Sequence, residues 1–409
     1  MTPPQLTLAS RVASVMVRQI FLCLLFTGAA CGQQEVTPIV AAADAAVIAP
    51  EDDAAAQQAD AVAAAQDDAA VAQDDAAAPQ DDAAAQDDAA EQDDAALDPP
   101  DARMRRDGGG RNRDAGMVVP SGDGGVQPCP TTGMGAIIAP AGCVVFTPAS
   151  AGASAAGDHA NDNSYALEPA GTVKDALVLF IPASGGIPAR QVGDPTQSFY
   201  NAAAGAGYHV LALAYASSQV IGILCSNDGP CFEPARRAVI TGVPQAGAPQ
   251  ALAGIQLDEG IIPRTEAALR KLALERPGEG WEQYLDSNGI VWPKIIAAGH
   301  SQGGGHAAFL GKLFSLRQVV QLASTCDAVG NMAAPWTHAD ATWATPPATR
   351  YVGFATAGDP LCGQHATVWQ AMGLDPSRMI DDAEICGGAP HAGAITCIDN
   401  FARWPTLLD

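Results

Sequence analysis

The sequence predicts an α/β fold built on a mostly parallel, doubly wound sheet. From residue 128 onward, apolar runs of strand length alternate with segments of helix length, which is the pattern of repeated βαβ units. The run LVLFI at 177–181 contains no polar residue, as expected for a strand that helices cover on both faces. A further apolar run at 295–298, in the strand expected at 293–298, leads through a glycine-rich turn into a helical segment.

The expected elements follow one another along the chain. Strands are expected at 143–147, 164–168, 177–181, 208–213, 293–298, 319–323 and 351–355. Helices are expected at 198–206, 263–273, 303–316 and 365–372. Because sites in such sheets form beyond the carboxyl ends of the strands, we expect functional residues in the turns that follow these runs.

The N-terminal part of the chain cannot build a hydrophobic core. Residues 1–118 hold 21 of the 45 acidic side chains and 7 of the 21 basic ones, and Gln-Asp-Asp-Ala-Ala recurs there five times. Paired, mutually repelling aspartates disfavour a stable helix, so 32–125 is expected to be a disordered acidic linker. The folded α/β domain is expected at 126–409. The net charge of −24 argues against nucleic acid as a partner.

The first 31 residues have the features of an export signal. Arg11 and Arg18 precede a short apolar run at 20–26, which is too short to span a bilayer as a helix. Gly28-Ala29-Ala30-Cys31 then resembles a bacterial lipobox, in which Cys31 would carry lipid, although Leu is usual where Gly28 stands. We expect an exported chain, anchored in the cell envelope as an outer-membrane lipoprotein. Cleavage after Ala30 without lipidation, which gives a periplasmic or extracellular protein, is the alternative.

Eight cysteines remain beyond Cys31, an even number that favours disulfides in an exported chain. Close spacing favours the pairs Cys129–Cys143, Cys225–Cys231 and Cys386–Cys397, which leaves Cys326–Cys362. A metal site is not expected, because no Cys-x-x-Cys pair is present and the histidines are scattered.

The strongest chemical signal is Gly299-His300-Ser301-Gln302-Gly303, which follows an apolar run and precedes a helix. A serine at such a strand-to-helix turn is strained and exposed above the sheet, at the positive end of the helix. Gly299 and Gly303 are expected to let neighbouring backbone pass closely. Ser301 is therefore the predicted nucleophile.

A nucleophilic serine needs a base and an acid that orients the base. In this fold the chain order is serine, acid, histidine, which favours His391, the last histidine, on a loop after the final strand. For the acid we prefer Asp359, a short turn after the strand at 351–355. Asp327, after the preceding strand, is the alternative, and Asp381 and Asp382 are lesser ones.

Acyl transfer also needs donors for the developing oxyanion. The backbone N–H of Gln302 is one candidate, and that of Ser184, in the loop after the strand at 177–181, is the other. Residues 216–256 are expected to form a lid or substrate wall. Its Arg236 and Arg237 are candidates to meet an anionic substrate, with solvated surface arginines as the alternative.

The chain resembles a poorly characterised family of exported bacterial α/β-hydrolase-fold proteins, and the segments that carry the resemblance lie at 180–186, 207–215 and 298–309. It is more distantly similar to lipases, esterases and polyester depolymerases. The resemblance covers about 173–391. It implies the α/β-hydrolase fold, Ser301, Asp359 and His391 as a triad, and the loop after Pro182 as oxyanion site. Pro182-Ala183 replaces the His-Gly pair that common esterases carry there.

These features predict a carboxylic-ester hydrolase that acts through an acyl-enzyme on a small-molecule or polymer ester. No metal or organic cofactor is expected, and membrane contact is expected only through the lipid anchor. Two alternatives remain: an amidase or peptidase that uses the same triad, and a non-catalytic surface binding module on a hydrolase scaffold. Trp336, Trp343 and Trp369 are expected either to line a pocket or to pack in the core.

Overall fold

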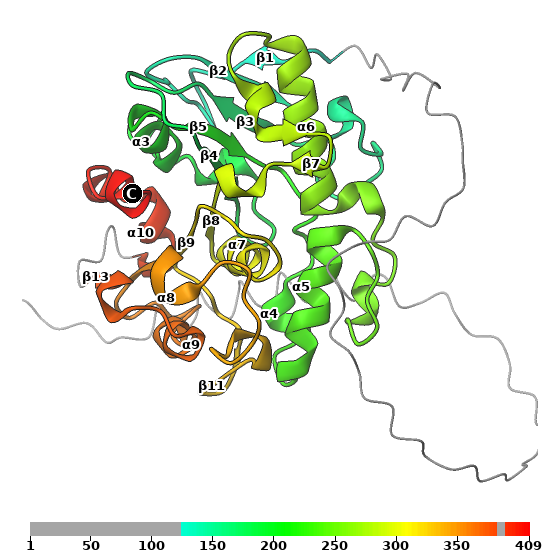
Figure 1. The fold of residues 1–409 in the computed structure, drawn as a ribbon, viewed down its shortest axis with the longest axis vertical. Coiled ribbons are helices and arrows are strands. Elements are labelled where there is room, and N and C mark those ends of the chain that lie inside the picture. The colour runs from blue at the N-terminus through cyan, green and yellow to red at the C-terminus, as the bar shows by residue number, and fades with distance from the viewer. Residues whose placement is uncertain (1–123, 383–388) are drawn as a thin grey trace, which may run out of the picture. The chain divides into compact units, whose positions relative to one another are not determined.

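A computed structural model describes residues 124–382 and 389–409 (Figure 1). The predicted export signal, Cys31 and nearly all of the predicted linker at 32–125 lie outside the described residues. No helix in the described part is both long enough and apolar enough to cross a membrane.

A nine-stranded sheet forms the centre of the domain, in the order β1-β2-β3-β5-β4-β8-β9-β12-β13. Its strands are β1 (Gln127–Pro128), β2 (Cys143–Phe146), β3 (Ser164–Leu167), β4 (Leu177–Ile181), β5 (His209–Ala212), β8 (Ile295–His300), β9 (Gln318–Leu322), β12 (Tyr351–Thr356) and β13 (Met379–Asp382). Strands β5 to β13 in this order run parallel, whereas β1, β2 and β3 pair antiparallel. Two short hairpins, β6 (Leu285–Asp286) with β7 (Gly289–Ile290) and β10 (Ala328–Val329) with β11 (Met332–Ala333), lie outside this sheet.

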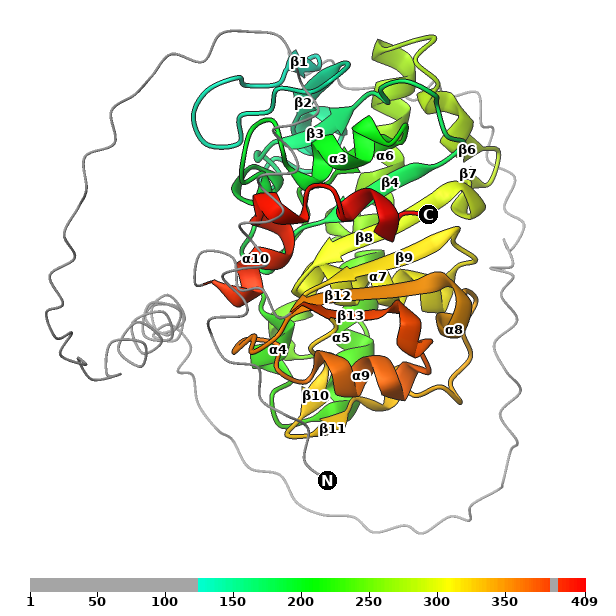
Figure 2. The same cartoon turned by 90° about the vertical axis from the view of Figure 1, so that its left-hand side faces the viewer.

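Helices cover both faces of the sheet. They are α3 (Phe199–Gly205), α4 (Ile221–Leu224), α5 (Phe232–Thr241), α6 (Ile261–Glu275), α7 (Gln302–Leu313), α8 (Pro347–Arg350), α9 (His365–Met372) and α10 (Pro390–Thr396). In Figures 1 and 2, α3 and α10 lie on one side of the sheet and α5, α6 and α7 on the other. Alternate residues of β4 therefore face two separate cores, Leu177 and Leu179 with α5–α7, and Val178 and Phe180 with α3 and α10.

This topology confirms the predicted α/β-hydrolase fold. The predicted strands and helices are all present, with ends shifted by at most three residues. The edge strands β1 and β13 and the helix α5 were not predicted. Because α5 packs on α6 and α7 with Phe232, Ala235 and Val239 in the core, this part of 216–256 belongs to the helical layer on that side of the sheet and is not a lid.

Three of the four expected disulfides are present: Cys129–Cys143, Cys225–Cys231 and Cys326–Cys362. The fourth expected pair, Cys386–Cys397, includes Cys386, which lies outside the described residues. Disulfides of this kind are typical of proteins that fold in an oxidising, exported environment.

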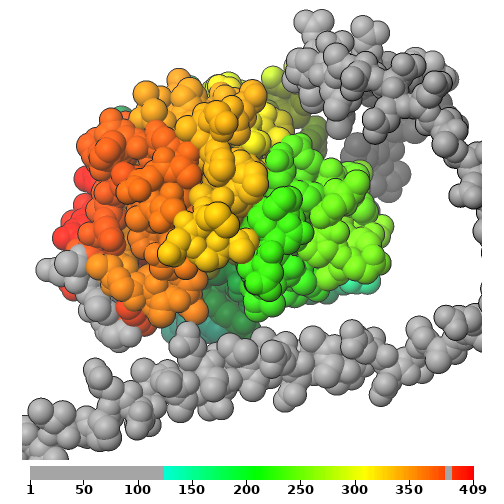
Figure 3. Space-filling model, turned by 90° about the horizontal axis from the view of Figure 1, so that it is seen from below, coloured from blue at the N-terminus to red at the C-terminus, as the bar shows by residue number. Residues whose placement is uncertain are grey.

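Figure 3 shows one face of the domain, where the green segment that contains α4 and α5 lies beside the yellow segment that contains β10 and β11. A pocket of about 340 Å³ lies between these two segments, lined by Pro230, Glu233 and Arg237 on one side and by Pro335 and Trp336 on the other.

Candidate active site

Ser301 lies between the end of β8 and the start of α7, in the turn that the sequence predicted. Its φ of 53° and ψ of −124° are strained for a residue with a side chain. The Ser301 N–H donates to Leu322 O of β9 at 2.9 Å, and its carbonyl accepts from Gly304 N at 3.0 Å. The sheet and the helix therefore hold the serine backbone from both sides, with the residue partly exposed.

The two flanking glycines are required by close backbone contacts. A Cβ on Gly299 would lie 2.4 Å from the carbonyl carbon and oxygen of Gly303. A Cβ on Gly303 would lie 2.0 Å from Ile181 O, at the end of β4. The prediction that neighbouring backbone passes closely at both positions is confirmed.

Asp359 and His391 form a hydrogen-bonded pair. His391 Nδ1 lies 2.7 Å from Asp359 Oδ2, while Asp359 Oδ1 accepts the backbone N–H groups of Leu361 at 2.9 Å and Cys362 at 3.1 Å. Burial raises the pKa of the Asp359 carboxyl, but the hydrogen bond and charge of His391 and the two backbone donors outweigh it, so the pKa is lowered overall. An ionised Asp359 keeps the proton of His391 on Nδ1 and leaves Nε2 as the nitrogen for proton transfer.

The other candidate acids have different partners. Asp327 is buried and binds the guanidinium of Arg236, with both oxygen–nitrogen distances at 2.5 Å. Asp381 Oδ1 lies 3.8 Å from His365 Nε2, and Asp382 pairs with Arg403. Of the four carboxylates considered, Asp359 is the one that contacts His391.

His391 belongs to the first turn of α10, so the expectation of a loop position was wrong. Proline at the start of this helix lacks the N–H that would remain unpaired there in any case, which lets Pro390 begin the helix one residue before the histidine. Cys386, the predicted disulfide partner of Cys397, lies outside the described residues.

His300, the residue before the nucleophile, joins His391 to the strand-to-helix turn at 299–303, here called the elbow. Its Nε2 donates to His391 O at 2.9 Å, and the two ring centroids are 4.8 Å apart. Burial, followed by the nearby His391, lowers the pKa of His300 to about 3, so the ring is neutral at physiological pH. Sequence reasoning did not single out His300, although it stands at the variable position of Gly-x-Ser-x-Gly.

The structure thus brings the His391–Asp359 pair against the residue that precedes Ser301. Ser301 Oγ makes no hydrogen bond to another described residue. In ligand-free enzymes the hydrogen bond between a nucleophile and its base is often long, and it shortens when substrate binds. The remaining histidines after the elbow helix lie elsewhere, with His365 Nδ1 2.7 Å from Cys362 O and His338 Nε2 3.4 Å from Ala333 O.

The two predicted oxyanion donors lie at the start of α7 and in the loop after β4. As the first residue of α7, Gln302 has a backbone N–H that precedes the helical hydrogen-bond ladder. In the loop, Gly185 N is already bound to Ser217 O at 2.7 Å, which leaves the neighbouring Ser184 N–H as the better candidate.

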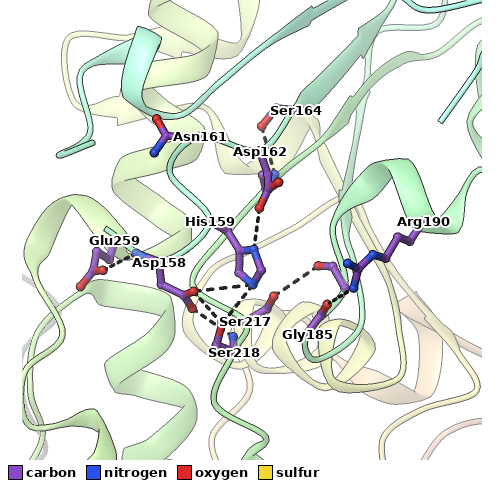
Figure 4. A network of polar contacts seen from close by, with 12 residues as sticks. Asp158, His159, Asn161, Asp162, Ser164, Gly185, Arg190, Ser217, Ser218 and Glu259 are labelled. Atoms are coloured by element: carbon purple, nitrogen blue, oxygen red, sulfur yellow. Dashed lines mark hydrogen bonds and ion pairs between the residues drawn. The ribbon is translucent and has the colours of Figure 1, made fainter. Parts of the chain in front are cut away.

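Several contacts hold the loop after β4. Ser217 Oγ donates to Gly186 O at 3.2 Å, and Arg190 Nη1 donates to Gly185 O at 3.2 Å (Figure 4). Behind the loop, the buried Tyr215 hydroxyl donates to Pro182 O at 3.1 Å. These bonds fix the backbone on either side of Ser184.

A second Ser–His–Asp chain, which the sequence did not indicate, lies beside this loop (Figure 4). His159 Nδ1 lies 2.7 Å from Asp162 Oδ2, and its Nε2 lies 3.2 Å from Ser218 Oγ. Ser218 also donates its hydroxyl to Asp158 Oδ1 at 2.7 Å and its N–H to Oδ2 at 3.0 Å. Ser218 lacks the strained backbone of Ser301, and α4 begins only at Ile221 rather than at the next residue. Its hydroxyl is bound to a carboxylate.

The side chain of Gln302 connects the elbow to the wall segment. Its Oε1 accepts Ile221 N at 2.8 Å and its Nε2 donates to Gln219 O at 3.1 Å. Gln219 in turn lines a pocket of about 330 Å³ with Ser218, Leu252 and Ile255. The beginning of 216–256 therefore does form a wall next to the elbow.

Burial decides the expectations for the two arginines and the three tryptophans. Arg236 is buried against Asp327 and Gln302, so it is not a surface residue that meets substrate, while Arg237 pairs with Glu233 near the surface. Trp336 and Trp369 belong to the hydrophobic core, and Trp336 also lines the pocket of about 340 Å³ described above. Trp343 packs edge-on against Tyr351 at the margin of the core. In the described ranges, no group of three or more His, Cys, Asp and Glu residues is arranged to hold a metal ion.

Comparisons with solved structures give distant similarity to hydrolases. An α/β serine hydrolase homologue from Coxiella burnetii is 14% identical with a TM-score of 0.35, over 60% of this chain and 92% of the other. The esterase domain of a Rhodothermus marinus protein is 14% identical with a TM-score of 0.34, over 60% and 90%. A hormone-sensitive lipase from a metagenome library is 14% identical with a TM-score of 0.30, over 69% and 86%. No protein-family model and no curated protein matches the sequence.

Proposed function

We propose that this chain is a serine hydrolase that cleaves carboxylic esters through an acyl-enzyme, with Ser301, His391 and Asp359 as its triad. The observation that carries the proposal is the strained Ser301 at the β8–α7 turn, with the His391–Asp359 pair packed against the residue before it. Strain of this kind is kept where a side chain must be presented to a substrate.

The mechanism follows from these positions. Ser301 Oγ attacks the ester carbonyl carbon while His391 Nε2 takes its proton, and the same proton then passes to the leaving alcohol. Asp359 holds the imidazole in the required tautomer and stabilises the imidazolium. The backbone N–H groups of Gln302 and Ser184 bind the oxyanion of the tetrahedral intermediate. Water, activated by His391, then releases the acid and restores the serine hydroxyl.

The substrate class is a small-molecule or polymer ester. Because the triad supplies the nucleophile, the base and the orienting acid, and the Gln302 and Ser184 N–H groups supply the oxyanion donors, the proposed reaction needs no metal or organic cofactor. The signal at 1–31 and Cys31 support an exported lipoprotein whose membrane contact is the lipid anchor. Amide or peptide cleavage uses the same residues, and a substrate panel of matched esters and amides separates the two.

Labelling by a fluorophosphonate probe, together with turnover of a short p-nitrophenyl ester, tests the nucleophile. We expect the wild-type chain to be labelled and active, Ser301→Ala to lose labelling and to lose turnover by at least about 10³-fold, and the matched control Ser218→Ala to keep both. Labelling that survives Ser301→Ala but disappears in Ser218→Ala would move the nucleophile to the chain of Figure 4. A wild-type chain that is neither labelled nor active would favour the binding module.

A further inference from the structure

Arg236 of α5 is a buried cation that the mechanism above does not use. Its Nε and Nη2 bind the two oxygens of Asp327, each at 2.5 Å, and its Nη1 donates to Gln302 O at 3.0 Å. Trp336 Nε1 donates to Asp327 Oδ2 at 2.8 Å. Arg236 is 2% exposed and Asp327 is 1% exposed. The guanidinium is thus locked in one orientation, with its third nitrogen donating to the backbone of the first residue of α7.

Stability alone is a weak explanation for this pair. Removing two charges from water is costly, and apolar side chains of similar volume often replace a buried ion pair without loss of stability. A side chain that only filled this space would not need a planar guanidinium that hydrogen-bonds to the backbone of α7. The contact with Gln302 O indicates that the guanidinium acts on the backbone at the start of α7.

The glycine run at the start of α7 shows how closely this helix packs against its neighbours, including Arg236. A Cβ on Gly303 would meet Ile181 O, and one on Gly304 would lie 2.5 Å from Ser324 Cβ. A Cβ on Gly305 would lie 2.1 Å from Arg236 Nη2. A glycine inside a helix is less stable than an alanine, and at Gly305 this loss allows the guanidinium to approach α7.

We propose that Arg236, oriented by Asp327, is a positioning residue for the Gln302 amide in the oxyanion site. By holding Gln302 O, the guanidinium fixes the first peptide planes of α7, and with them the direction of the N–H that faces the developing negative charge. This inference rests on the proposed function. It assigns to Asp327 a role behind the oxyanion site, in place of the acid role that the sequence left open.

The effect belongs to the transition state rather than to substrate binding. When an oxyanion donor is slightly displaced, the ester carbonyl of the substrate can still bind. The displaced donor stabilises the tetrahedral intermediate less well. Loss of positioning should therefore lower kcat and leave KM nearly unchanged. A merely structural role would lower the amount or the thermal stability of the folded enzyme without changing kcat per active site.

The test compares wild type with the double variant Arg236→Met, Asp327→Leu, which removes both charges and leaves neither buried alone. Arg236→Lys keeps the charge but loses the fork, and Arg237→Met, on the exposed side of α5, is the matched control. We measure kcat and KM for a p-nitrophenyl ester, with active sites counted by fluorophosphonate titration, and the inhibition constant of a trifluoromethyl ketone. For the double variant we expect kcat to fall by about 10- to 100-fold, KM to change less than about 2-fold, and the inhibition constant to rise in parallel with the loss of kcat.

Arg236→Lys should show an intermediate loss of kcat, and Arg237→Met should behave as wild type. Unchanged kcat per titrated site in the double variant, with only a lowered melting temperature, would overturn the positioning role. If the double variant does not fold, Arg236→Lys decides by the same criteria. A wild-type chain without turnover or labelling would instead refute the proposed function, so the two failures are distinguishable.

Discussion

The carboxylate of Asp359 is buried, and three donors keep it charged. His391 Nδ1 and the N–H groups of Leu361 and Cys362 all bind it, and together they lower its pKa in spite of burial. The same contacts define the role that separates Asp359 from Asp327, whose oxygens are occupied by Arg236 and Trp336.

Asp359→Asn should therefore disable the enzyme without unfolding it. An asparagine retains the shape but favours the wrong imidazole tautomer, so we expect kcat to fall by roughly 10³- to 10⁴-fold. Steady-state kinetics on titrated enzyme would measure the loss. Full activity in Asp359→Asn, combined with loss in Asp327→Asn, would exchange the two assignments.

The lowered pKa of Asp359 also makes the free energy of unfolding depend on pH, in a defined direction. Its ionised form is favoured by folding, so its contribution is present above the unfolded pKa of about 3.9 and is lost as the pH falls through the lower folded pKa. The difference in free energy of unfolding between wild type and Asp359→Asn should be largest near neutral pH and shrink below about pH 4. Urea denaturation at several pH values measures this difference, and a gap that widens in acid would contradict the assignment.

At the scale of elements, the site depends on the approach of three backbones: the end of β4, the end of β8 and the start of α7. Gly303 lies where they meet, and its absent Cβ leaves room for Ile181 O. Main-chain atoms of a central strand cannot move aside as the end of a flexible side chain can.

Gly303→Ala should for this reason destabilise the fold by about 1–3 kcal/mol or more and reduce activity. Gly205→Ala, at the end of α3, is the matched control because no atom lies within 4 Å of the added Cβ. Thermal or urea denaturation of both variants provides the comparison. Equal stability of the two would show that the backbone around the elbow is less tightly packed than these contacts imply.

At the scale of the whole domain, Cys326–Cys362 ties the segment after β9 to the turn that carries Asp359. It closes 36 residues, whereas Cys225–Cys231 closes 6. Because loop-closure entropy grows with loop length, removal of the longer bridge should cost roughly 4 kcal/mol and removal of the shorter one roughly 2 kcal/mol.

The two double serine variants, Cys326→Ser with Cys362→Ser and Cys225→Ser with Cys231→Ser, test this order by urea denaturation. The longer bridge also lies next to Asp359, since Cys362 N donates to its Oδ1. We therefore expect kcat to fall in the first variant and to stay near wild type in the second. A larger loss from the shorter bridge would show that local packing, rather than chain entropy, sets the contribution.

The sequence by itself determined the features that depend on short stretches of chain. Apolar runs and spacing predicted the parallel core strands and the helices around them, and the glycine pattern predicted the turn at Ser301. Close cysteine spacing predicted two bridges that the structure contains, and the third, Cys326–Cys362, is the pair that the close pairs left over. These features can be predicted because the residues of a short segment determine its backbone periodicity, its strain and the closure of short loops.

Only the tertiary structure decided which distant groups meet. It joined Asp359 to His391 and gave Asp327 to Arg236, it brought His300 against His391, and it assembled the chain of His159 and Ser218 from segments far apart in sequence. The approach of side chains from separate strand ends depends on sheet order, twist and packing, and no local pattern of residues specifies these.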